Sequence, residues 1–191
     1  MEEIRCFIAI ELPDDIREGL GKVIAGLKSS QLDVKWVDPF SIHLTLNFLG
    51  YVAPDRIAEI TEAIADAATG VPPFFLEIKK LGVFPNLNRV RVVWVGVEGE
   101  TDKLLQFQKR LETNLDILGF PPEERDFTPH LTLARVRENV SPEERRELGQ
   151  LIAATGAPTI GRFTATTVSL MRSQLARTGA VYTQLAAVEL K

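Results

Sequence analysis

His-Leu-Thr-Leu occurs twice in this chain, at residues 43–46 and 130–133, and the two copies contain both of its histidines. A tetrapeptide can repeat by chance in 191 residues, but chance rarely places every histidine of a chain inside the repeat. Histidine is the side chain whose ordinary pKa lies nearest neutrality. The paired motif therefore predicts acid–base chemistry in a site built from two similar halves.

The sequence around the two motifs repeats as well. The two histidines are 87 positions apart, and at the same offset residues 7–11 fall on residues 94–98. Ala-Ala-Thr-Gly at 67–70 recurs 86 positions later. Apolar periodicity and turn residues predict strands and helices in the same order in both halves. Strands are expected at 4–12, 34–37, 41–49, 74–84, 91–97, 129–136, 163–172 and 181–190, and helices at 14–27, 54–69, 102–118 and 141–155.

This order predicts an α+β fold of duplicated β-α-β-α-β units with pseudo-twofold symmetry around a central cleft. Residues 1–191 are expected to form a single bilobed domain. Its repeats span roughly 4–84 and 90–172, and 180–190 is a final strand.

The bulk composition narrows the possible classes of protein. The chain is 45% hydrophobic and 25% charged, as expected for a globular protein with a core of its own. The single cysteine, Cys6, excludes an intramolecular disulfide, and its apolar neighbours predict burial. A net charge of −4 argues against coating long nucleic acid. No signal peptide or membrane span is visible, so a cytoplasmic protein without membrane contact is expected, and we expect a monomer.

Strand alternation explains why histidine and threonine occur together in the motif. Successive side chains of a strand point to opposite faces, so His43 shares a face with Thr45, and His130 with Thr132. The leucines between them are expected to anchor each strand on its own lobe. Two imidazoles supply a base and an acid, and two hydroxyls can donate hydrogen bonds to phosphate oxygens. That set suits cleavage of a phosphodiester.

Other interpretations have weaker support. A single motif copy would be an ordinary half-buried strand, but two copies that hold every histidine favour function. A zinc site lacks a cysteine cluster or a carboxylate motif. A serine triad lacks a nucleophile elbow, and ATP binding lacks a phosphate loop.

Several further segments extend the motif pair into a family pattern. They are residues 5–10 (Arg-Cys-Phe-Ile-Ala-Ile), 35–37 (Lys-Trp-Val), 43–50 (His-Leu-Thr-Leu-Asn-Phe-Leu-Gly), 91–97 (Arg-Val-Val-Trp-Val-Gly-Val) and 127–135 (Phe-Thr-Pro-His-Leu-Thr-Leu-Ala-Arg). With them the whole chain resembles the two-histidine (2H) phosphoesterase superfamily. Within it, the chain is most similar to the RNA 2′,3′-cyclic phosphodiesterase branch, also called 2′-5′ RNA ligases.

The resemblance implies hydrolysis of RNA 2′,3′-cyclic phosphate ends to 2′-phosphomonoesters, with weak 2′-5′ joining as a related reaction. It implies no metal and no cofactor. The partners would be RNA ends, with tRNA fragments as one source. His130 is expected to be the base and His43 the acid, although pseudo-symmetry makes the two nearly interchangeable. Thr45 and Thr132 would hold the phosphate.

More residues are candidates for substrate contact. Arg135 is expected to share the face of His130 and to bind phosphate, and Phe7 and Phe48 to wall the cleft or stack on a base. Trp36 and Trp94 are expected to be packing residues. Weaker candidates for RNA contact are Lys35, Arg91, Arg172 and Tyr182. Two alternatives stay open: a non-catalytic module that binds RNA or phosphate, and the same chemistry on small cyclic nucleotides.

Overall fold

The computed structural model describes residues 2–28, 32–176 and 179–191. Its elements follow the predicted order closely. The strands are β1 (Ile4–Glu11), β2 (Val34–Trp36), β3 (His43–Val52), β4 (Phe74–Phe84), β5 (Val92–Gly99), β6 (His130–Val136), β7 (Thr159–Ala165), β8 (Thr167–Ala176) and β9 (Gly179–Glu189). The α-helices are α1 (Asp14–Lys28), α2 (Ile57–Ala68), α3 (Thr101–Ile117) and α4 (Pro142–Thr155), and the short 3-10 helices are η1 (Pro39–Ser41) and η2 (Pro54–Arg56).

The helix ends follow from local sequence signals. Ser141 caps α4 by accepting a hydrogen bond from the backbone of Glu144, whose carboxylate accepts one from the backbone of Ser141 in return. Gly156 ends the helix with a φ of 77°, a conformation that side chains with a Cβ rarely adopt. The repeated Thr-Gly pair marks the corresponding end of α2, where Gly70 has a φ of 71°. The two helix stops predicted from the sequence repeat are confirmed.

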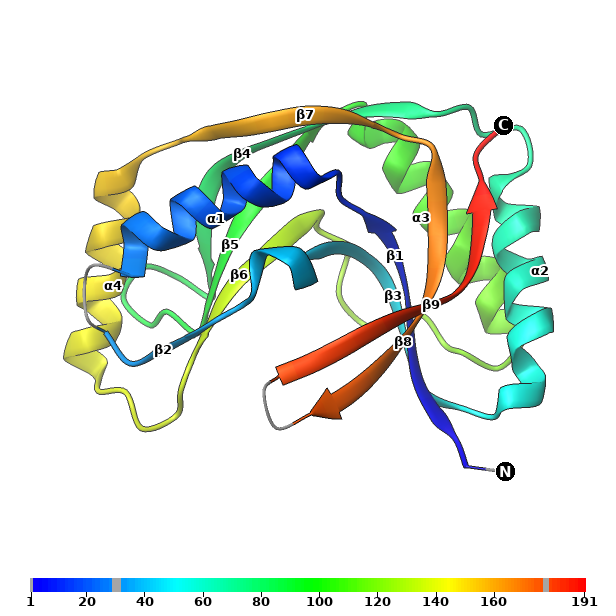
Figure 1. Cartoon of the computed structure of the whole chain (residues 1–191), viewed down its shortest axis with the longest axis horizontal. Coiled ribbons are helices and arrows are strands. Elements are labelled where there is room, and N and C mark those ends of the chain that lie inside the picture. Colours follow the sequence, from blue (N-terminus) through cyan, green and yellow to red (C-terminus); the bar gives the residue numbers. More distant parts are fainter. Residues whose placement is uncertain (1, 29–31, 177–178) are drawn as a thin grey trace.

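The fold is α+β, as predicted, and its strands form two antiparallel sheets. The first sheet has the order β3-β1-β8-β9 and the second β2-β6-β5-β4-β7. The sheets curve toward each other in Figure 1, with α2 and α3 on one flank and α1 and α4 on the other. Each sheet takes strands from both halves of the chain, because β8 and β9 join the first sheet while β2 and β4 join the second. The sequence repeats therefore do not coincide with the two sheets.

The predicted single strand at 163–172 is wrong. The chain forms β7 in the second sheet and then β8 in the first, and it crosses between them at Thr166. The Thr166 carbonyl accepts a hydrogen bond from the Leu190 amide at 2.9 Å, which ties the crossing to the end of β9. No glycine or proline marks the break, and the β-branched residues 166–168 suit a strand on either side, so the local pattern hides it.

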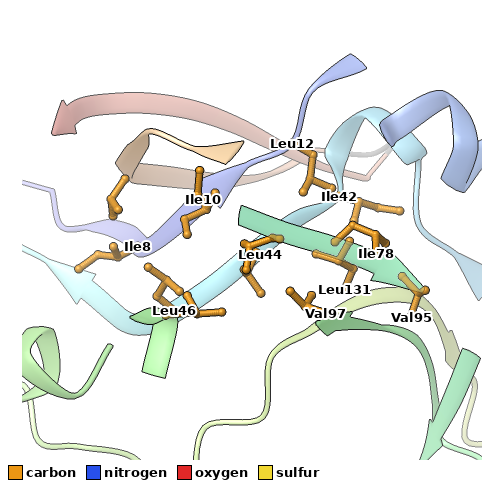
Figure 2. Packing of buried hydrophobic residues seen from close by; sticks show 14 of the residues in the cluster. Ile8, Ile10, Leu12, Ile42, Leu44, Leu46, Ile78, Val95, Val97 and Leu131 are labelled. Atoms are coloured by element: carbon orange, nitrogen blue, oxygen red, sulfur yellow. The ribbon is translucent and has the colours of Figure 1, made fainter. Parts of the chain in front are cut away.

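The main hydrophobic core of the described residues contains side chains from both sheets. The leucines of both motifs are buried in it: Leu44, Leu46, Leu131 and Leu133. Figure 2 shows Leu44 and Leu131 within this common packing, among isoleucines and valines of other strands. The prediction that the leucines anchor the motif strands is confirmed, but they share one core instead of each serving its own lobe. Cys6 is buried, as predicted.

None of the helices in the described ranges combines the length and the apolar composition that crossing a bilayer requires.

Candidate active site

The two histidines open equivalent strands, His43 at the start of β3 and His130 at the start of β6. His43 Nδ1 lies 3.0 Å from the carbonyl oxygen of Ser41, and His130 Nδ1 lies 2.6 Å from that of Thr128. A carbonyl oxygen only accepts, so each Nδ1 carries the hydrogen and donates it. Each Nε2 is therefore the atom left to accept or deliver a proton. Because Ser41 and Thr128 are also 87 positions apart, both halves fix their imidazole in the same way.

The histidines and threonines of both motifs line one cleft of about 900 Å³, together with the predicted phosphate-binding and aromatic residues. They come from β1, β3 and β6, and they are Phe7, His43, Thr45, Phe48, His130, Thr132 and Arg135. The cleft lies where the motif strands of the two sheets meet, so each sheet supplies one imidazole and one hydroxyl. The structure thus brings the whole predicted set together, while the role of each residue stays a prediction.

A β-bulge in each motif strand decides what lies beside the histidines. In a regular strand Phe48 and Arg135 would point away from His43 and His130, because an odd spacing of five residues separates each pair. The pairing of β3 with β1 skips position 46, and the pairing of β6 with β5 skips position 133. These positions are equivalent in the two halves. The extra residue turns the rest of each strand over, so Phe48 and Arg135 face the cleft.

His43 lies in an aromatic pocket. Phe7 stacks on its ring at a centroid distance of 4.5 Å, and Tyr182 meets it edge-on at 4.9 Å. Phe7 is only 3% exposed and packs with Ala9, Met171 and Tyr182. Phe7 is therefore a wall of the site that holds the histidine, with little surface left for a base.

His130 has aromatic neighbours of a different geometry. Phe84 meets its ring edge-on at 5.2 Å, and Trp94 lies 6.3 Å away. Trp94 occupies the position equivalent to Phe7, so the packing role predicted for it includes support of the histidine. The space for Trp94 depends on Gly82, where a Cβ would lie 2.2 Å from the indole ring.

The surroundings of His43 favour its neutral form. Burial lowers the pKa of this imidazole, and the positive charge of Arg17 lowers it further. The hydrogen bond to Ser41 and the charge of Glu11 act in the opposite direction and do not outweigh burial. The Glu11 carboxylate itself accepts hydrogen bonds from Ser169 and Gln184. His43 is thus set up to stay unprotonated to lower pH than an exposed histidine.

Arginines supply the positive charge of the cleft. Arg5, Arg91, Arg125 and Arg135 all line it. In the described part of the chain none of the four pairs with a carboxylate, whereas Arg17, Arg56, Arg137 and Arg146 do so elsewhere. Unpaired guanidinium groups in a cleft suit phosphate binding. Among residues 2–28, 32–176 and 179–191, no three His, Cys, Asp or Glu side chains gather closely enough to bind a metal ion.

The family model described as LigT like Phosphoesterase matches the chain twice, over residues 10–94 and 95–182. The chain belongs to this family. The double match agrees with the duplication seen in the sequence and with the two equivalent histidine sites.

Two relatives of this LigT-like phosphoesterase match over nearly their full length. A protein of Methanothermobacter thermautotrophicus named RNA 2′,3′-cyclic phosphodiesterase is 36% identical, over 96% of this chain and 97% of its own. One of the same name from Methanocaldococcus jannaschii is 30% identical, over 94% and 96%. The crystal structure of Escherichia coli LigT complexed with phosphate has a TM-score of 0.76 at 26% identity, covering 100% and 99%. The LigT complex with 3′-AMP has a TM-score of 0.72 at 28% identity, with the same coverage.

The site of this LigT-like phosphoesterase also contains residues that sequence reasoning missed or undervalued. Of the weaker candidates, Arg91 and Tyr182 line the cleft, whereas Lys35 and Arg172 do not. Arg5 was not predicted, although it lies two residues before Phe7 on the same strand and so shares its face. Phe84 was missed because nothing in the end of a predicted strand signals contact with a distant histidine.

Proposed function

We propose that this enzyme hydrolyses 2′,3′-cyclic phosphate ends of RNA to 2′-phosphomonoesters by two-histidine acid–base catalysis. The observation that carries the proposal is the matched pair of imidazoles in one cleft, each with Nδ1 donating to a backbone carbonyl and Nε2 left for proton transfer. The names of the relatives, which span almost the whole chain, support the same activity.

The reaction needs one proton removed and one proton delivered. A water molecule attacks the phosphorus atom while a neutral imidazole takes its proton at Nε2. The bond from phosphorus to O3′ breaks, and the second imidazole gives its Nε2 proton to O3′. The phosphate stays on O2′, and the ring opens to a 2′-phosphomonoester with a free 3′-hydroxyl. The hydroxyls of Thr45 and Thr132 and the guanidinium of Arg135 stabilise the negative charge that grows on the phosphate oxygens.

The burial of His43 supports the opposite assignment of roles to the one expected from the sequence. A base must be neutral before the reaction, and the lowered pKa of His43 favours that form. We therefore assign the base to His43 and the acid to His130. In a related reaction, the 5′-hydroxyl of a second RNA end would attack phosphorus in place of water. O3′ would again leave with the proton of the acid, and the product would be the weak 2′-5′ joining. We propose RNA ends, including those of tRNA fragments, as partners, and a monomer as the working form.

The decisive test is the identity of the product. An RNA oligonucleotide with a 2′,3′-cyclic phosphate end is incubated with the enzyme in excess EDTA, and the product is followed by ³¹P NMR. We expect complete conversion to the 2′-phosphomonoester, because the reaction uses only groups of the protein. Binding without turnover would instead favour the non-catalytic module, and a 3′-phosphomonoester would contradict the assignment of O3′ as the leaving oxygen.

The pH dependence tests the assignment of the base. The rate constant kcat/KM for a cyclic mononucleotide is expected to follow a bell whose acid limb reports the base. In Tyr182→Ala the ring that covers His43 is gone, so water reaches the imidazole, its pKa rises and the acid limb moves to higher pH. Tyr182→Phe keeps the ring and is the matched control. Its acid limb is expected at the same pH as that of the wild type. A shift of the alkaline limb in Tyr182→Ala would instead make His43 the acid.

A further inference from the structure

A row of side chains crosses the first sheet one step beyond the histidine site. Tyr51 on β3 lies opposite Arg5 on β1, Arg5 lies opposite Ser173 on β8, and Ser173 lies opposite Tyr182 on β9. Directly opposed residues of a sheet share a face, so these four side chains form one cross-strand row, which we call the outer row. The neighbouring row holds Phe48, Phe7 and Met171 and carries the packing around His43. The outer row therefore extends the surface that begins at the catalytic imidazole.

The outer row and its neighbour expose large aromatic groups. Tyr51 is 69% exposed and Phe48 is 58% exposed, whereas Phe7, between Phe48 and Met171, is buried. A second bulge brings the two exposed rings onto one face: the pairing of β3 with β1 skips position 49. Gly50, with a φ of 71°, provides the turn of the backbone there. Two exposed rings along one strand give flat surfaces on which bases can stack.

Arg5 gives this surface its charge. Its side chain is exposed and lines the cleft, and in the described part of the chain no carboxylate pairs with it. It lies two residues from Phe7 along β1, which is a distance of about 7 Å. That distance is of the same order as the length of one nucleotide. An arginine beside exposed aromatic rings is a combination that binds single-stranded nucleic acid without reading its sequence.

We propose that the outer row is a subsite for the nucleotide on the 5′ side of the scissile end. Arg5 binds the phosphodiester that joins the terminal nucleotide to the one before it, and Tyr51 or Phe48 stacks on the preceding base. This rests on the proposed function and deepens it, because it makes an oligonucleotide end, and not a cyclic mononucleotide, the preferred substrate. A mononucleotide reaches the histidines and Tyr182 but leaves Arg5 and Tyr51 without a ligand.

The test compares two substrates that differ only by this second nucleotide. We measure kcat/KM for a cyclic mononucleotide and for a dinucleotide ending in the same 2′,3′-cyclic phosphate, and take the ratio of dinucleotide to mononucleotide. In the wild type this ratio is expected to exceed one. Arg5→Ala lowers it about tenfold, because one phosphate contact is lost, and weakens the salt dependence measured with the dinucleotide. Arg5→Lys keeps the charge and restores part of the ratio.

Arg162→Ala is the matched control, because Arg162 is an exposed arginine of β7 that does not line the cleft. Its ratio should equal that of the wild type. A ratio in Arg5→Ala equal to that of the wild type, in a variant that turns over both substrates, would overturn the subsite while leaving the proposed function intact. Failure of the wild type to hydrolyse either substrate would instead overturn the proposed function. The ratio also separates the subsite from general damage to the fold, which would lower both rates together.

Discussion

His130→Ala lowers kcat for hydrolysis of a 2′,3′-cyclic phosphate by about 10²–10⁴-fold, and His43→Ala does the same. Each variant removes one of the two proton transfers that the proposed mechanism requires, because His43 and His130 are the two histidines at the starts of β3 and β6. Steady-state turnover of a cyclic mononucleotide at fixed pH measures the loss. The double variant is expected to be barely worse than either single one, because the two imidazoles act as a unit.

Thermal unfolding provides the control for these variants. Both imidazoles lie at the cleft and neither belongs to the buried core, so the midpoint of unfolding should change by only a few degrees. Binding of inorganic phosphate should persist in both variants, since the threonine hydroxyls and Arg135 remain. Full activity in either variant would remove that histidine from the mechanism, and a variant that is unfolded at the assay temperature would call for the milder change to glutamine.

Leu131→Ala destabilises the protein by about 2–5 kcal/mol, the largest effect on stability that we expect from a single change in a motif. Leu131 is 0% exposed, and it belongs to the core that also holds Leu44. Truncation removes apolar contacts and leaves a cavity that rigid neighbouring strands cannot fill. Urea unfolding monitored by circular dichroism gives the free energy of unfolding, and an unchanged m-value would show that the compactness of the unfolded state is unaltered.

Two further variants serve as controls for the loss of stability in Leu131→Ala. Leu131→Met keeps the volume nearly constant and should cost less than about 1.5 kcal/mol. Ile117→Ala removes a side chain that is 81% exposed at the end of α3, and it should stay within about 0.5 kcal/mol of the wild type. A small loss in Leu131→Ala would mean that the motif leucines do not anchor the motif strands.

The sequence was sufficient to predict most of the elements, and to predict that the motif residues gather in one cleft, because the informative patterns are local. Alternation within the motif places His43 with Thr45 and buries Leu44, and the spacing of 87 reveals that a second copy supplies the partner set. The bulges could not be predicted, since a skipped position depends on how two strands align and not on either strand alone. For this reason the expected placement of Arg135 beside His130 held only through a distortion that the sequence does not announce.

The passage of the chain from β7 in the second sheet to β8 in the first could not be predicted for a related reason. Residues 163–172 have the composition of a continuous strand, and only the competition between two sheets for partners breaks it at Thr166. The different surroundings of His43 and His130 could not be predicted either, because identical motifs predict identical environments. Phe7 and Tyr182 come from opposite ends of the chain, so the burial of His43 depends on contacts that no local pattern contains.

Each sheet contains strands from both halves of the chain, so neither half could complete its sheets alone. Alone, the first half would retain only the pairing of β1 with β3, while β2 and β4 would present bare edges to solvent. Strands of the second half pair with those edges. The short link between β4 and β5 keeps the second half close to the first. A half-length chain would need a second copy of itself to complete these sheets, in the manner of a domain-swapped dimer. The duplicated chain holds both copies in one molecule, so the two histidines can have different surroundings.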